Sequence, residues 1–207
     1  MIFSLTIALL TSSVAPQWYR EKEFPPPERV QAMVEACDVA DGTVGFDKLL
    51  QSDVVTFSER IDLNEIQLAC LAEVAFQTGY TFLIPEAFAP AFYAHKEAIA
   101  APWNRELATE HLAELGKLAG LPVPAEGETD VEFARKLESH CEAHGALSSE
   151  FGPQAISPDW VVGQRSDFDT TGKAMLCLLS SGTLSGFEIG MIGNEAMSEN
   201  TGDGGGS

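Results

Sequence analysis

The four cysteines lie in two stretches of the chain that show the same order of features, and this constrains the fold more than any other property of the sequence. Cys37 and Cys70 are 33 positions apart, and Cys141 and Cys177 are 36 positions apart. In each pair the second cysteine is followed directly by Leu and, nine positions on, by a Gly and an aromatic residue, namely Gly79-Tyr80 and Gly186-Phe187. Self-similarity of this kind predicts an internal duplication.

The first predicted copy covers residues 27–85. Pro27 suits the first turn of a helix, and apolar residues then recur with helical spacing as far as Cys37, so we expect a helix that ends near Gly42. An apolar run predicts a strand at 54–57, and a second apolar stripe predicts a helix between Asp62 and Gly79. Residues 80–84 predict a second strand.

The second predicted copy covers residues 129–196. A helical stripe runs from Thr129 toward Gly145, and an extended piece is expected at 160–162. A buried helix is predicted around 174–179, and a strand at 187–192.

Two of the predicted helices begin with a capping-box pattern. Asp62 stands three positions before Glu65, and Thr129 stands three positions before Glu132. The order helix, strand, helix, strand therefore occurs twice. It predicts an α+β fold with two similar halves around a pseudo-twofold axis. The alternative is that two ordinary helix–strand units share this order by coincidence.

Further segments separate and flank the two copies in a single predicted domain at 27–196. A helical insertion is expected at 86–121, interrupted at Pro90 and with a new helix that starts at Pro102. Residues 122–128 are expected to be a linker. The last residues, 197–207, end in Thr-Gly-Asp-Gly-Gly-Gly-Ser and predict a disordered tail.

The amino-terminal residues have the pattern of a signal peptide. Residues 2–10 form an apolar run that is too short to span a bilayer, and small residues follow it. The predicted leader is 1–15, with cleavage after Ser13 as an alternative, and residues 16–26 are expected to be an extended linker. A positive charge before the apolar run is missing, so a buried first element of a cytosolic protein is the competing interpretation.

An even number of cysteines in an exported chain is typical of disulfide bonds. The repeat predicts the pairs Cys37–Cys70 and Cys141–Cys177, one within each copy. The chain has no Cys-x-x-Cys, which argues against a thioredoxin-like redox site and a zinc ribbon. The alternative is four reduced cysteines that are buried as small apolar residues.

The charge of the chain narrows the class of partner. Twelve Lys and Arg stand against 31 Asp and Glu, a net charge of −19, while 45% of the residues are apolar. A nucleic-acid binder needs clustered basic residues, so that class is excluded. We expect no stable membrane insertion once the leader is removed, and a cationic peptide or protein as the favoured kind of partner.

His140 and His144 are the candidate metal ligands. On a helix, two imidazoles four positions apart share one face and can chelate Zn²⁺. The segment His-Cys-Glu-Ala-His lacks the His-Glu-x-x-His order of zinc hydrolases. The competing interpretation is that both histidines complement the dipole at the end of the helix before Gly145.

Other catalytic patterns fail on inspection. Residues 167–172 begin like a calcium-binding EF-hand loop, but Leu178 stands where the bidentate Glu should be. The nucleophile motifs Gly-x-Ser-x-Gly and Ser-x-x-Lys are absent from the sequence. We therefore predict no cofactor.

The two Cys-Leu helices, the leader and the closing residues Ile192-Gly193-Asn194-Glu195-Ala196 resemble uncharacterised exported proteins of alphaproteobacteria. The resemblance extends over most of the mature chain. It implies a periplasmic or secreted setting and brings with it no activity and no catalytic residue.

Three functional hypotheses follow. The first is an exported binding or interaction protein that is not an enzyme, with its site in a groove between the halves. The second is a metal-dependent hydrolase that uses His140 and His144. The third is a cytoplasmic protein with reduced cysteines. The sequence makes no prediction of the ligand or of the oligomeric state.

Overall fold

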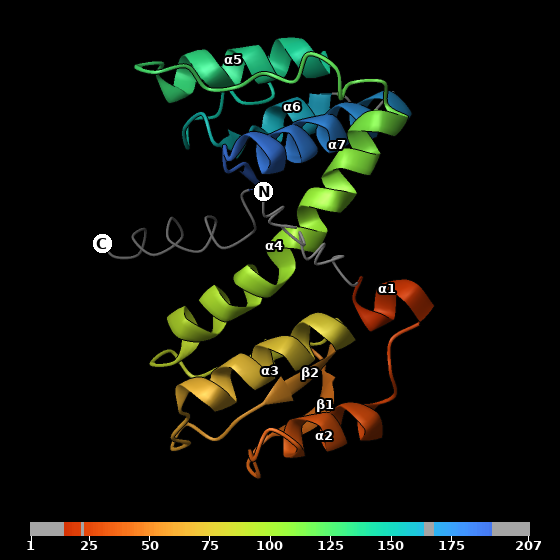
Figure 1. Cartoon of the computed structure of the whole chain (residues 1–207), viewed down its shortest axis with the longest axis vertical. Coiled ribbons are helices and arrows are strands. Elements are labelled where there is room, and N and C mark those ends of the chain that lie inside the picture. Colours follow the sequence, from red (N-terminus) through yellow and green to blue (C-terminus); the bar gives the residue numbers. More distant parts are fainter. Residues whose placement is uncertain (1–14, 22, 164–167, 192–207) are drawn as a thin grey trace, which may run out of the picture. The chain divides into compact units, whose positions relative to one another are not determined.

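In the computed structural model of the protein, residues 15–21, 23–163 and 168–191 are described, and contacts divide the chain between Trp103 and Asn104 into two compact units (Figure 1). The structure combines helices with short strands, which confirms the α+β class. Apart from Ala15, the predicted leader lies outside the described residues. So do the predicted tail and the closing residues 192–196.

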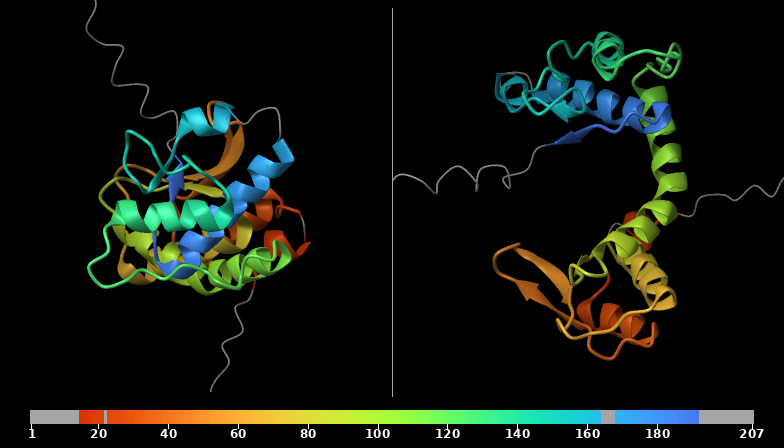
Figure 2. Two further views of the ribbon diagram at one scale, coloured as in Figure 1. Left: turned by 90° about the horizontal axis from the view of Figure 1, so that it is seen from above. Right: turned by 90° about the vertical axis from the view of Figure 1, so that its left-hand side faces the viewer.

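The first unit is built from three helices, a three-stranded sheet and the start of a fourth helix. The sheet has the order β1-β2-β3, with β1 antiparallel and β3 parallel to the central strand. Figure 2 shows the hairpin of β1 and β2 in orange. Val55 of β2 lies opposite Val44 of β1 and Phe82 of β3. The elements are α1 (Gln17–Glu21), α2 (Pro27–Glu35), β1 (Thr43–Asp47), β2 (Ser52–Thr56), α3 (Glu65–Thr78) and β3 (Thr81–Leu83).

Helix α2 begins at Pro27, as predicted, whereas α3 begins later than predicted. Its N-cap is Asn64, whose side chain accepts hydrogen bonds from the backbone N–H groups of Ile66 and Gln67. The Gln67 side chain reciprocates by accepting from the Asn64 backbone, which completes a capping box. The predicted Asp62 box is therefore wrong by two residues. Gly79 ends the helix with φ 73°, a conformation that favours glycine.

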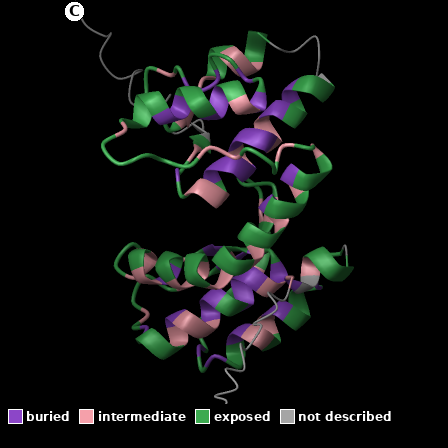
Figure 3. Ribbon diagram, turned by 45° about the horizontal axis from the view of Figure 1, so that its top comes forward, coloured by how far each residue is buried: buried purple, intermediate pink, exposed green. Residues whose placement is uncertain are grey.

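The core of the first unit lies between α2, α3 and the sheet. Val30, Val34, Val55 and Leu71 are fully buried there, and Figure 3 marks such residues in purple. A disulfide joins Cys37, just after α2, to Cys70 in α3, with the two Cα atoms 5.7 Å apart. This confirms the first predicted cysteine pair.

Residues 16–26, expected to be an extended linker, instead contain the short helix α1, which packs on α3. The Trp18 indole donates a hydrogen bond to the Phe76 carbonyl at 3.1 Å, and the Trp18 ring stacks on that of Phe24. The Tyr80 hydroxyl donates to the Pro25 carbonyl at 2.9 Å. Aromatic packing therefore fixes this segment, which its polar sequence did not indicate.

Helix α4 (Ala89–Glu114) is one continuous helix that begins in the first unit and ends in the second. Pro90 lies in its first turn, and Pro102 lies inside it, so the predicted helix start at Pro102 is wrong. A proline inside a helix removes one backbone hydrogen bond, here to the carbonyl of Ala98. The division between the two units falls one residue after Pro102, between Trp103 and Asn104.

The second unit contains three further helices and two very short strands. These elements are α5 (Asp130–Cys141), β4 (Ala155–Ile156), α6 (Pro158–Gly163), α7 (Phe168–Ser185) and β5 (Gly190–Met191). Strands β4 and β5 pair in parallel, with Ala155 opposite Gly190. The predicted capping box of Thr129 and Glu132 is confirmed at the start of α5.

Residues 160–162, predicted to be extended, belong to helix α6. The Ser157 hydroxyl accepts a hydrogen bond from the Trp160 backbone at 3.4 Å, and Pro158 occupies the first turn. A serine cap followed by proline favours the start of a helix. This preference outweighs the tendency of the β-branched residues in the segment to form a strand. The strand forms at 155–156 instead, immediately before this cap.

The core of the second unit lies between α5 and α7. Leu137 and Leu178 are fully buried in it. A disulfide joins Cys141 at the end of α5 to Cys177 in α7, with the Cα atoms 5.5 Å apart. This confirms the second predicted pair.

The two units share an internal plan but differ in detail. In each, a disulfide ties the first long helix or the turn after it to a later helix, and the strands before and after that later helix pair in parallel. The first unit adds strand β1, and the second adds helix α6. These likenesses do not confirm the duplication, which stays a prediction.

Candidate functional site

The two predicted metal-binding histidines do not share a helical face. Helix α5 ends at Cys141, and Glu142 takes the left-handed conformation with φ 56°. The Ala143 N–H then bonds back to the Glu138 carbonyl at 2.9 Å, which closes a Schellman-type turn. His144 therefore lies beyond the helix, and the expectation that the helix runs toward Gly145 is wrong.

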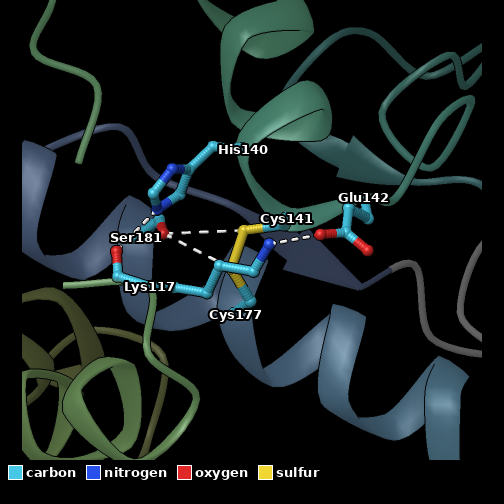
Figure 4. Close-up of polar contacts among 6 residues, drawn as sticks. All are labelled: Lys117, His140, Cys141, Glu142, Cys177 and Ser181. Carbon is cyan, nitrogen blue, oxygen red and sulfur yellow. Dashed lines mark hydrogen bonds and ion pairs between the residues drawn. A yellow bond between two sulfur atoms is a disulfide. The ribbon is translucent and has the colours of Figure 1, made fainter. Parts of the chain in front are cut away.

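The His140 ring is engaged by the backbone. Its Nε2 lies 2.8 Å from the Lys117 carbonyl oxygen, as Figure 4 shows. Because a carbonyl only accepts, Nε2 carries the proton and donates in this arrangement. Nε2 is therefore occupied by this contact, and only Nδ1 of His140 remains as an acceptor.

A cross-connection next to His140 holds the end of α5. The Lys117 ammonium lies 2.6 Å from a carboxylate oxygen of Glu142. This hydrogen bond, assisted by the lysine charge, lowers the pKa of Glu142. Nearby, the buried Ser181 hydroxyl lies 3.6 Å from the sulfur of Cys141 and 3.9 Å from that of Cys177. We assign this group of residues to the support of α5.

Metal coordination has no further support in the structure. Within 15–21, 23–163 and 168–191, no group of three or more His, Cys, Asp or Glu side chains is placed to hold an ion. Asp167, the first residue of the rejected EF-hand pattern, lies outside the described residues. Asp169 pairs with Lys173 at 2.5 Å on α7.

A pocket of about 380 Å³ lies in the second unit, between one face of α5 and the loop at 147–153. The helix contributes positions i, i+3, i+4 and i+7, which share a face. The pocket is lined by Val131, Ala134, Arg135, Glu138, Leu147, Ser148, Ser149, Gly152 and Pro153. Its volume is in the range of small-molecule sites, and its walls combine apolar side chains with a few polar groups, as such sites do.

Glu138 is the unusual residue of this pocket, because its side chain is charged and only 7% of the residue is exposed. Its Oε1 accepts a hydrogen bond of 2.6 Å from the Leu147 backbone N–H. The turn at Glu142 makes this contact possible, because it brings the loop back along α5. The carboxylate thus holds the loop that forms the far wall of the pocket.

The second carboxylate oxygen of Glu138 is open. None of the described residues donates a hydrogen bond to Oε2. Every fully buried side-chain oxygen of the described residues has a hydrogen-bond partner, so Oε2 is not fully buried. Oε2 therefore contacts solvent, and Glu138 is one of the residues that line the pocket. A buried carboxylate with one free oxygen is a strong acceptor for an ammonium or guanidinium group.

Arg135 lines the same pocket one turn earlier on α5. It is exposed and makes neither an ion pair nor a hydrogen bond with the described residues. The pocket also contains two hydroxyl groups, of which Ser149 accepts from the Phe151 backbone at 3.2 Å. A positive and a negative side chain thus border one pocket without pairing with each other.

A second hollow, of about 620 Å³, lies beside α1 in the first unit. It is lined by Ala15, Trp18, Tyr19, Arg20, Glu23 and Phe24. These residues adjoin positions 14 and 22, which are outside the described part of the chain. We therefore take the pocket at Glu138 as the candidate site.

Sequence reasoning missed this site and selected the histidines a few positions away. A signal for Glu138 was present, because it stands beside Leu137 and three positions before Cys141, on the stripe that faces the core. A charged side chain on the buried face of a helix needs a hydrogen-bond or ion-pair partner. The partner, the Leu147 N–H, was not visible without the turn at Glu142.

Comparison with known proteins assigns the chain to no family, because no family model, no curated protein and no solved structure matches it. Among the described residues, no helix is long and apolar enough to cross a membrane.

Proposed function

We propose that this protein is an exported binding protein that is not an enzyme, and that it holds a cationic group of its ligand on Glu138. The observation that carries the proposal is Glu138, a residue that is only 7% exposed and that uses only one of its two carboxylate oxygens within the protein. A ligand ammonium completes the hydrogen bonding of this group.

The electrostatics of the chain support a cationic ligand. The net charge of −19 attracts positive groups over a distance. Close to Glu138 the interaction is stronger, because a partly buried carboxylate is less well screened by water than a surface one. A charge-assisted hydrogen bond of this kind contributes about 1.5–3 kcal/mol.

The two disulfides support export, because they favour an oxidising compartment over the cytosol. Export to the periplasm or the medium agrees with the leader-like residues 1–15. A cytosolic protein with reduced cysteines, the alternative hypothesis, has no corresponding support.

Binding is favoured over catalysis by the composition of the pocket. The nine described residues that line it include two serines but no His, Cys or Lys that would activate a nucleophile. The hydrolase hypothesis depended on His140 and His144 sharing a helical face, and we do not propose it.

The test uses the folded full chain and a lysine tetrapeptide with blocked ends as the cationic probe. We expect binding by titration calorimetry that weakens with salt, and a loss of at least tenfold in Glu138→Gln. The amide keeps an oxygen for the Leu147 N–H, so this variant removes the charge while the loop contact remains.

The matched control is Glu150→Gln, an exposed residue in the same loop that does not line the pocket. It changes the net charge equally and is expected to leave the affinity within twofold of the wild type. An equal loss in both variants would mean that general charge attraction, and not the pocket, binds the probe. Binding that is insensitive to Glu138→Gln would overturn the proposal.

A further inference from the structure

We propose that the ligand of this pocket is a free α-amino acid with an apolar side chain, whose ammonium group binds Glu138 and whose carboxylate binds Arg135. The inference rests on the proposed function and adds a second charged contact to it. It starts from the observation that two side chains of opposite charge line one pocket and do not pair with each other.

The spacing of the two residues suits the charges of an amino acid. Arg135 and Glu138 are three positions apart on α5, so their Cβ atoms are neighbours at about 5–6 Å. In an α-amino acid the ammonium and the carboxylate are attached to the same carbon atom. Two receptors side by side on one helical face therefore bind both groups at once.

Arg135 argues against a ligand that is only cationic. Its guanidinium would repel a second positive group that enters the same pocket, and this repulsion opposes the attraction of Glu138. A ligand carboxylate removes the conflict, because guanidinium binds carboxylate through two parallel hydrogen bonds. Since Arg135 is exposed, we expect its contribution to be smaller than that of Glu138.

The remaining walls accept an apolar side chain. Val131 and Ala134 of α5 and Leu147 and Pro153 of the loop are apolar residues of the lining. The hydroxyl groups of Ser148 and Ser149 are the further polar groups of the lining. A volume of about 380 Å³ has room for an amino acid of the size of leucine together with bound water.

The test compares two probes, leucine and leucinamide, which differ by the carboxylate. Wild-type protein is expected to bind leucine at least five times more tightly than leucinamide. In Arg135→Met this preference is expected to fall to within twofold, because the guanidinium is lost and most of the side-chain length is kept. Glu138→Gln is expected to weaken both probes at least tenfold.

The outcomes separate this inference from the proposed function. If leucinamide or the blocked lysine peptide binds as tightly as leucine, depends on Glu138 and ignores Arg135→Met, the site takes a simple cation and the inference is wrong. If none of the probes binds in a manner that depends on Glu138, both proposals fail. Unchanged thermal unfolding of both variants shows that they are folded.

Discussion

The two units of the protein have disulfides in corresponding places but hold their cores together differently. The first unit has a three-stranded sheet whose central strand buries Val54 and Val55, and aromatic rings cover one end of α3. In the second unit the strands are two residues long, and the loop after α5 is held by the Glu138 carboxylate. The unit with the smaller sheet is thus the one in which a buried carboxylate lines a pocket.

This difference shows how a site can be obtained from a small fold. A sheet satisfies its backbone groups with other backbone groups. A loop that is held by a carboxylate leaves one oxygen of that group available. We infer that the second unit contains the functional site because its structure depends on side-chain contacts.

The largest expected effect is the loss of a disulfide. In the loop-entropy model, a bridge that closes about 35 residues contributes about 4 kcal/mol, nearly the same for both units. We expect Cys141→Ala with Cys177→Ala to unfold the second unit, because its sheet is too small to replace the bridge. Hydrogen exchange with mass spectrometry follows each unit separately.

The matched variant, Cys37→Ala with Cys70→Ala, is expected to leave the sheet of the first unit protected from exchange at moderate temperature. Equal loss of protection in the two double variants would show that the difference in sheet size has no bearing on stability. In that case the comparison drawn above would be wrong.

The second effect is the loss of the buried carboxylate. Glu138→Ala leaves the Leu147 N–H buried without an acceptor, which costs about 1–3 kcal/mol. Glu138→Gln retains an acceptor and is expected to lose less than half as much. Denaturant unfolding measures both, and a loss from the glutamine variant as large as that from alanine would argue against the role given to Oε1.

Sequence reasoning succeeded for features that depend on local spacing. The cysteine pairs followed from two helices that repeat at similar intervals, and the cap at Thr129 followed from a pattern of four residues. It failed where a cap and an apolar run competed, as at Ser157 and 160–162. It failed also at the site. Glu138 contacts Leu147 only because Glu142 takes the left-handed conformation and turns the chain back, and no glycine at this position indicated such a turn.

The third effect tests the helix caps, which are alike in the two units. Asn64→Ala and Thr129→Ala each remove the side-chain oxygen of a complete capping box, at a cost of about 1 kcal/mol. Similar losses are expected, because both caps are on the surface. The change in the denaturation midpoint measures them, and a difference larger than twofold would show that one helix start depends on further contacts.

The smallest effect is a difference in the response of the two units to pH. In the second unit, contact with Lys117 lowers the pKa of Glu142, and hydrogen bonds from Lys136 and from Thr129 lower those of Glu128 and Glu132. A carboxylate whose pKa is lowered by folding stabilises the folded state at pH values above the pKa that the group has in the unfolded chain. This stabilisation is lost as the pH falls through the pKa of the group in the folded protein.

The first unit responds in the opposite direction at high pH. Burial raises the pKa of Tyr80 above its ordinary value of 10, and the charges of Asp53 and Glu28 add to the shift. The contribution of Tyr80 to the stability of the folded state is complete below pH 10. It is lost as the pH rises through the pKa of Tyr80 in the folded protein.

Hydrogen exchange of the full chain is therefore expected to show the second unit opening first in acid, below about pH 4. Lys117→Met removes the cause of the shift at Glu142 and is expected to reduce the acid sensitivity of the second unit, while Tyr80→Phe is expected to remove the alkaline effect in the first. If both units respond alike to acid in the wild type, the carboxylate contacts of the second unit do not distinguish it from the first. An acid response that is unchanged in Lys117→Met would instead assign the sensitivity to the cap at Thr129 and the ion pair of Glu128 with Lys136.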